Sequence, residues 1–100
     1  MRKYELIYIV KPQEEEAIEA LVAKFDGIIT DNGGTTEKTH RWGKRRLAYP
    51  IQDLTEGYYV LQHLVADPPV INELDRIMKI PDDLLRHIIV VVEDSSKIII

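Results

Sequence analysis

THRWGKRRLAYPI occupies Thr39–Ile51 and is the stretch from which the fold of this chain is best worked out. It belongs to a longer segment rich in β-forming residues, which predicts one extended strand from Thr35 to Ile51. A break is expected near Gly43, because a missing side chain often marks a β-bulge. Pro50 indicates an edge strand, since proline cannot donate to a ladder on both sides. If the bulge is present, the alternation resets there, and the sequence leaves open which face the basic residues take.

The same stretch concentrates positive charge. Between Lys38 and Arg46 there are five Lys or Arg residues and no Asp or Glu. The whole chain carries a formal net charge of −4, so subtracting this +5 leaves −9 on the other residues. A local basic run attracts a polyanion by Coulomb attraction and counterion release, and the rings of Trp42 and Tyr49 can stack on unpaired bases. This pattern favours RNA binding over an active site; the alternative is a solvated basic face with both rings in the core.

Other strands are predicted on both sides of this segment. In Tyr4–Val10 and Tyr58–Val65 both alternating sets contain apolar residues, which is typical of central strands or of strands covered on both faces. Asp53–Gly57 has the composition of a polar turn. Leu84–Val92 is rich in β-branched residues and predicts the last strand.

Two amphipathic helices are predicted between the strands. The first runs from Gln13 to about Asp31, with an apolar stripe at helical spacing, and Asn32-Gly33-Gly34 ends it. The second begins at Asp67-Pro68-Pro69 and ends before Pro81. Glu14, Glu15 and Glu16 suit the positive end of the first helix dipole better than they suit a metal cluster.

The order strand, helix, strand, strand, helix, strand predicts an α+β, ferredoxin-like βαββαβ fold. Right-handed crossovers place two helices on one face of a four-stranded antiparallel sheet, with the first and third strands as central neighbours. Some of the apolar residues on those strands should then lie on the uncovered face: Ile7, Ile9, Tyr59 and Leu61. Such a patch either marks a partner site or is a tolerated surface.

WGKRRLAYPI, residues 42–51, resembles the signature of the bacterial small-ribosomal-subunit protein six family. Members carry a glycine, then basic residues, then Leu-Ala-Tyr-Pro-Ile. The opening Met1-Arg2-Lys3-Tyr4-Glu5 is also similar to the start of the family, and the similarity runs to about Val92. The resemblance implies the same ferredoxin-like fold and a non-catalytic, cytoplasmic ribosomal protein. It also implies binding to the central part of the small-subunit ribosomal RNA, with small-subunit protein eighteen as heterodimer partner.

The resemblance and the residue pattern together give the expected site residues. The expected RNA contacts are Arg2, Lys3, Arg41, Trp42, Lys44, Arg45 and Arg46. The face expected to bind the protein partner consists of Ile7, Ile9, Tyr59 and Leu61. Arg2 and Lys3 are expected to extend the patch formed by the basic run. Trp42 either stacks on RNA or packs under the strand, with packing slightly favoured, whereas Leu47 and Tyr49 are expected to pack in the core or along the edge.

Length and composition limit the alternatives. One hundred residues predict a single domain, with an ordered core of about residues 1–93 and a short tail of residues 94–100. The absence of cysteine excludes disulfides, a thiolate nucleophile and cysteine-ligated metals. No signal peptide or membrane span is expected.

Enzymatic and ligand-binding alternatives fit the residues less well. His40, His63 and His87 show no metal-binding spacing, so no metal, cofactor or small-molecule substrate is expected. An acylphosphatase-type enzyme of this fold is similar in outline, but the Val10–Gln13 loop has neither the glycine nor the arginine of its phosphate cradle. A small-ligand regulatory module that dimerises through the open sheet face would explain the apolar face but not the basic run.

Overall fold

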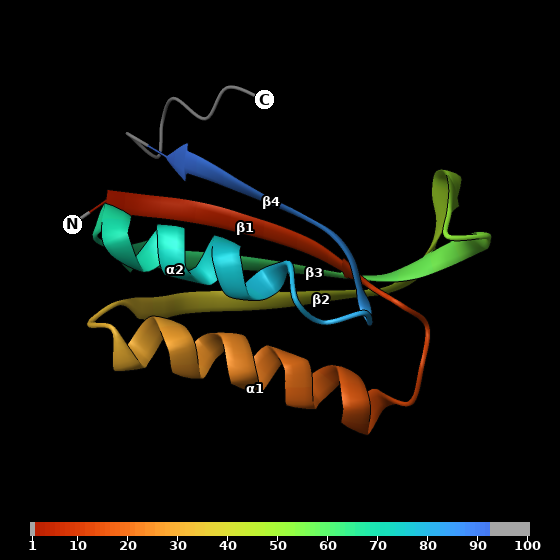
Figure 1. Cartoon of the computed structure of the whole chain (residues 1–100), viewed down its shortest axis with the longest axis horizontal. Helices are drawn as coiled ribbons and strands as arrows, with labels where there is room; N and C mark the ends of the chain where they lie inside the picture. The colour runs from red at the N-terminus through yellow and green to blue at the C-terminus, as the bar shows by residue number, and fades with distance from the viewer. Residues whose placement is uncertain (1, 93–100) are drawn as a thin grey trace.

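The computed structural model describes residues 2–92, and the predicted tail of residues 94–100 lies outside them. The elements are β1 (Arg2–Val10), α1 (Glu15–Asp31), β2 (Thr35–Ile51), β3 (Leu54–Ala66), α2 (Pro68–Met78) and β4 (Leu84–Val92). The strands lie in the order β2-β3-β1-β4, and every neighbouring pair is antiparallel. Both helices lie on the same side of this sheet (Figure 1). The predicted ferredoxin-like architecture is confirmed, with β1 and β3 at its centre.

Strand alternation and helical periodicity together build the core. On β1, every second residue points toward the helices and is buried: Tyr4, Leu6, Tyr8 and Val10. The apolar stripe of α1 meets them, and the rings of Tyr8 and Phe25 pack edge to face with centroids 5.3 Å apart. The helix α2 adds its own stripe over the other half of the sheet: Val70, Leu74 and Met78. This core covers only one face of the sheet.

A polar cluster between α1 and the sheet fixes the position of the edge strand β2. Asp26 on α1 accepts hydrogen bonds from Gln62 Nε2 at 2.6 Å and from Thr36 Oγ1 at 3.1 Å. Gln62 is fully buried and also donates to Thr39 Oγ1 at 3.2 Å. Because buried polar groups are costly without partners, these bonds favour one placement of β2 against α1. Nearby, burial raises the pKa of the Tyr8 phenol above its ordinary value.

The hairpin joining β2 and β3 is longer than the sequence predicted. The predicted polar turn at Asp53–Gly57 is wrong, because β3 already begins at Leu54, opposite Ile51. The turn consists of Gln52 and Asp53, which both have positive φ values of 51° and 65°. Beyond the helices the hairpin projects as an arm (Figure 1). Both faces of such an arm meet water, so its polar residues gave no sign that they were paired in a strand. The first helix likewise begins at Glu15, two residues later than predicted.

The predicted bulge in β2 is confirmed. The register with β3 shifts between Arg41 and Gly43, and Gly43 has a φ of 83°, a conformation that glycine adopts without strain. Two further irregularities lie on either side of this bulge, and β2 is an edge strand, as Pro50 indicated. Bulges increase local twist, and in Figure 1 the end of the hairpin curls out of the plane of the sheet.

Gly57 allows the hairpin arm to pack closely on the rest of the sheet. This residue is buried, and a Cβ placed on it would meet Ile9 Cγ2 and would lie 3.3 Å from Leu47 Cδ2. Leu47 is itself only 7% exposed, so the sequence correctly indicated that it packs. The close approach at Gly57 therefore holds the base of the arm against β1.

We expect Gly57→Ala to lower the free energy of unfolding by about 1–3 kcal/mol, because the methyl group overpacks this contact. Gly27→Ala is the matched control: it lies inside α1, and a Cβ there would meet nothing within 4 Å. That substitution should raise stability by about 0.5–1 kcal/mol through better helix propensity. Urea denaturation of both variants measures the difference, and equal stabilities would contradict the packing role of Gly57.

Candidate nucleic-acid interface

The sheet face turned away from the helices, here called the open face, has an apolar middle. The strand register gives one row across it from β2 to β4, formed by His40, Leu61, Ile7 and Ile88. The next row toward the hairpin is formed by Gly43, Tyr59, Ile9 and Arg86. The four residues predicted for the partner face all lie here and are half-buried. The structure thus confirms their placement on an uncovered face.

The bulges in β2 divide the basic run between the two faces of the sheet. Lys38 and Arg45 lie opposite His63 and Gly57, which belong to the open face. Arg41 lies opposite Val60, which points toward the helices. Lys44 and Arg46 lie opposite Tyr58 and Glu56 and share that side by strand alternation. The basic residues therefore lie on both faces of the edge strand β2 and do not form one continuous surface on either face.

Arg41 is already bound within the chain. Its guanidinium forms a two-pronged ion pair with Glu19 on α1, with Nε–Oε2 at 2.5 Å and Nη2–Oε1 at 2.7 Å. The hydrogen bonds from Arg41 hold the pKa of the Glu19 carboxyl below its ordinary value. Sequence reasoning counted Arg41 among the RNA contacts, and in the free chain its side chain is paired with Glu19 on α1.

Arg41→Gln should return the pKa of Glu19 toward its ordinary value, which a carboxyl-detected NMR titration measures. In the wild type the lowered pKa of Glu19 adds to the free energy of unfolding. This contribution is complete above the pKa that Glu19 has in the unfolded chain, and it is lost as the pH falls through the pKa that Glu19 has in the folded chain. At neutral pH we expect little change in the free energy of unfolding, since both side chains are about 40% exposed. An unchanged Glu19 titration would contradict the pairing.

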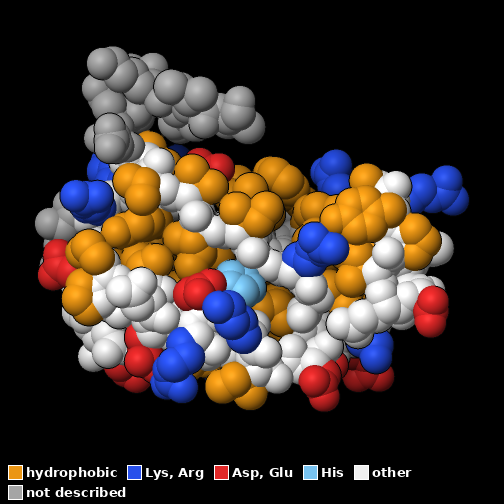
Figure 2. Space-filling model, turned by 45° about the horizontal axis from the view of Figure 1, so that its top comes forward, with side chains coloured by type: hydrophobic (Ala, Val, Ile, Leu, Met, Phe, Trp, Pro, Cys, Tyr) orange, Lys and Arg blue, Asp and Glu red, His pale blue; other side chains and the backbone are white. Residues whose placement is uncertain are grey.

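Three neighbouring basic residues remain available at the hairpin end. Lys44, Arg45 and Arg46 are exposed, and none of them forms an ion pair with a residue of the described range 2–92. Arg45 Nε donates to the carbonyl of Trp42 at 3.5 Å, and its guanidinium lies 5.7 Å from the centroid of the Trp42 ring. Figure 2 shows Lys and Arg side chains around hydrophobic ones at this end of the molecule. The arm therefore carries a local cluster of available positive charge.

The structure adds one residue that the sequence did not single out. The guanidinium of Arg86 on β4 lies 5.1 Å from the ring centroid of Tyr49, although their strands are at opposite edges of the sheet. Tyr49 is 54% exposed, so it is not a core residue. The one available signal was that Arg86 is the only Lys or Arg in the predicted last strand. The curled arm brings Tyr49 over Arg86, so Arg86 lies next to the basic residues of the arm.

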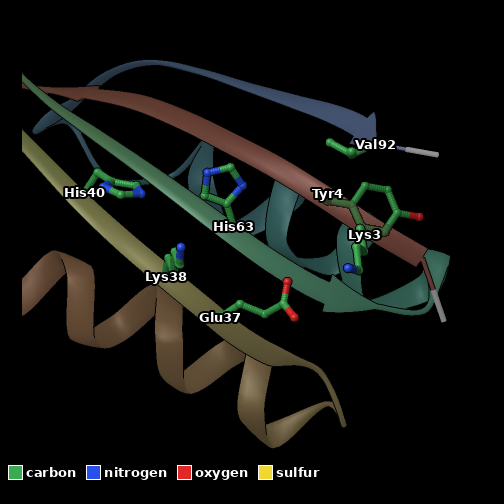
Figure 3. A pocket seen from close by; sticks show the side chains of 7 residues that line it. All are labelled: Lys3, Tyr4, Glu37, Lys38, His40, His63 and Val92. Carbon is green, nitrogen blue, oxygen red and sulfur yellow. The ribbon is translucent and has the colours of Figure 1, made fainter. Parts of the chain in front are cut away.

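Arg2 and Lys3 lie at the other end of the sheet. Lys3 faces Val65 and Arg45 faces Gly57, eight residues apart on β3, which at strand spacing is about 26 Å. Arg2 and Lys3 therefore lie far from the cations of the hairpin end, and their contact with RNA stays a prediction. Lys3 instead lines a hollow of about 340 Å³ with Lys38, Glu37, His40 and His63 (Figure 3).

The two histidines of this hollow come from different strands. Their rings lie edge to face with centroids 5.7 Å apart, although His40 and His63 are far apart in sequence. Within residues 2–92, no group of three or more His, Cys, Asp or Glu is arranged to hold a metal ion. Neither described helix is both long enough and apolar enough to cross a membrane.

Comparisons with known proteins agree with these features. Residues 3–91 match the family model described as ribosomal protein S6. The small ribosomal subunit protein bS6 of Exiguobacterium sibiricum is 56% identical over 90 residues, covering 89% of this chain and 95% of that protein. The crystal structure of 30S ribosomal protein S6 from Thermotoga maritima superposes with a TM-score of 0.86 at 29% identity, covering 91% of this chain and 87% of that one.

Proposed function

The chain belongs to the ribosomal protein S6 family, and from this premise we propose that it binds the central part of the small-subunit ribosomal RNA together with small-subunit protein eighteen. As a family member it is a non-enzymatic component of the small ribosomal subunit in the cytoplasm. The proposal concerns which surfaces make the contacts.

The proposal of RNA binding rests on the cations at the hairpin end. Lys44, Arg45 and Arg46 are cationic, exposed and without an ion-pair partner in the described part of an acidic chain. Phosphate contacts by such residues give affinity and fix orientation, while arginine forks suit the geometry of phosphate oxygens. Arg2 and Lys3, at the far end of the sheet, would contact a separate stretch of the same RNA. Arg41 contributes less, because Glu19 holds its guanidinium.

The open face supports the proposal for the protein partner. Its two central rows bring apolar side chains from β3, β1 and β4 together, and Ile88 is 58% exposed. A mixed-charge end at Lys3 and Lys38 and a basic end at the hairpin flank these rows. An apolar centre with a polar rim is the usual composition of a protein interface.

A titration of the central fragment of small-subunit ribosomal RNA, with and without protein eighteen, tests the proposal. We expect tight binding when both proteins are present and weaker binding by this chain alone. A plot of the logarithm of the binding constant against the logarithm of the salt concentration should have a negative slope. Three phosphate contacts from the arm should contribute about −2 to −3 to this slope, and protein eighteen contributes the rest. A duplex RNA of equal length is the control, and equal affinity for both RNAs would contradict specific binding.

A further inference from the structure

Aromatic rings and guanidinium groups lie side by side across the hairpin end of the open face. Trp42 lies beside Tyr59 with nearly parallel rings, at an interplanar angle of 21° and a centroid distance of 6.4 Å. Arg45 lies over Trp42, and Arg86 lies over Tyr49. The register places Tyr59 and Arg86 in one row, separated only by Ile9. We call these five residues the aromatic–arginine strip: Trp42, Arg45, Tyr49, Tyr59 and Arg86.

The rings of Trp42 and Tyr49 are more exposed than aromatic rings that pack in the core of this chain. Trp42 is 44% and Tyr49 is 54% exposed, whereas the large aromatic rings of Tyr8 and Phe25 are fully buried in the core. Neither Arg45 nor Arg86 forms an ion pair with a carboxylate of residues 2–92. Each guanidinium instead lies over an aromatic ring. Flat cationic groups and flat aromatic groups therefore lie next to each other on the surface of the molecule. Such surfaces match the faces of nucleobases.

We propose that the aromatic–arginine strip stacks the bases of unpaired nucleotides, at a bulge or junction next to the helix whose phosphates the arm contacts. The inference rests on the proposed RNA-binding function and names the part of the RNA that this end recognises. Unpaired bases stack on aromatic rings and on arginine planes, and paired bases cannot do so because they are stacked within the duplex. Lys44 and Arg46 lie on the same arm but on the opposite side of β2, where they would contact phosphates of the adjoining helix.

The charge around the strip favours RNA over a docked protein as its occupant. Two guanidinium groups, those of Arg45 and Arg86, lie over the rings on the open face, and no carboxylate neutralises them by an ion pair within the described range. The row of His40, Leu61, Ile7 and Ile88 contains no charged Lys or Arg and suits a protein surface better. The two occupants would therefore meet near Tyr59 and Ile9.

Trp42 is the only tryptophan of the chain, so its fluorescence reports directly on stacking. The probes are two RNA hairpins with the same stem, one fully paired and one with a two-nucleotide bulge. We expect the bulged hairpin to quench the Trp42 emission and to bind about tenfold more tightly than the paired one. Trp42→Leu should remove this preference without changing the salt dependence, because stacking involves no counterion release.

Variants of the second ring and arginine pair extend the test. Arg86→Gln and Tyr49→Leu should each reduce the preference for the bulged hairpin severalfold, and Arg76→Gln on α2 should leave it unchanged as the matched control. Equal affinity for the two hairpins without quenching would overturn the inference while leaving phosphate binding intact. Loss of protein eighteen binding by Trp42→Leu, with RNA preference retained, would assign the strip to the protein interface. If the wild type binds neither hairpin, the stacking inference fails, whereas the proposed function fails only if the chain with protein eighteen does not bind the central fragment of the ribosomal RNA.

Discussion

Replacing Arg45 and Arg46 together by glutamate is expected to weaken binding to the small-subunit ribosomal RNA by about a hundredfold or more at low salt. Both side chains are exposed on the hairpin arm, and neither forms an ion pair in the described part of the chain. The change removes two phosphate contacts and places two negative charges beside the RNA. Each lost contact should flatten the salt slope by about one unit, so the double variant should lose about two.

The matched control for this variant is Arg76→Glu combined with Lys79→Glu. These residues lie at the end of α2, are mostly exposed, and give the same change in net charge. Because they lie away from the arm, we expect only a small loss of RNA affinity from the change in net charge. Isothermal titration or filter binding at four salt concentrations measures both variants. An equal loss of affinity in the two double variants would show that net charge, and not the arm, decides binding.

A glutamate at Ile7 is expected to weaken the complex with protein eighteen by at least about a hundredfold. Ile7 lies at the centre of the open face, opposite Leu61 on one side and Ile88 on the other. A carboxylate there would be buried without a partner when the second protein docks, and interface positions near the centre carry most of the binding energy. Analytical ultracentrifugation or titration calorimetry of the purified pair measures the loss.

Ile88→Glu separates docking from folding. Ile88 is 58% exposed in the free chain, so this substitution on the same row should leave the fold intact and still weaken the complex. Ile80→Glu is the matched control, since Ile80 is 64% exposed and lies just after α2 on another part of the surface. Full retention of binding by the Ile88 variant would remove the open face from the interface.

The elements that could be predicted from sequence are those in which one face is buried. Alternation in β1, the apolar stripes of α1 and α2, and the proline at the start of α2 each record a local pattern of burial or capping. The hairpin arm could not be predicted in this way, because beyond the helices most of its residues are exposed and the buried Leu47 belongs to no repeating pattern. Thr55 and Glu56 therefore resembled a loop, although they belong to β3.

Some features of the candidate site could likewise be predicted from the sequence, and others could not. Composition and the WGKRRLAYPI stretch indicated a basic edge, and the availability of Lys44, Arg45 and Arg46 agrees with it. Nothing in the sequence pairs Arg41 with Glu19, 22 residues earlier, or separates Lys3 from the hairpin. The ion pair depends on how α1 crosses β2. The separation of Lys3 from the hairpin depends on the end of the sheet at which β1 begins.

The sequence by itself determined the order of the elements, the single covered face and the presence of a basic, aromatic edge, because local periodicity and charge content are properties of neighbouring residues. The tertiary structure decided which cations remain free, which histidines meet and where Arg86 lies. Bulges reset the side-chain alternation of β2, and the curl of its hairpin carries Tyr49 across to β4. Such contacts join strands from opposite edges of the sheet, and no local pattern in the chain specifies them.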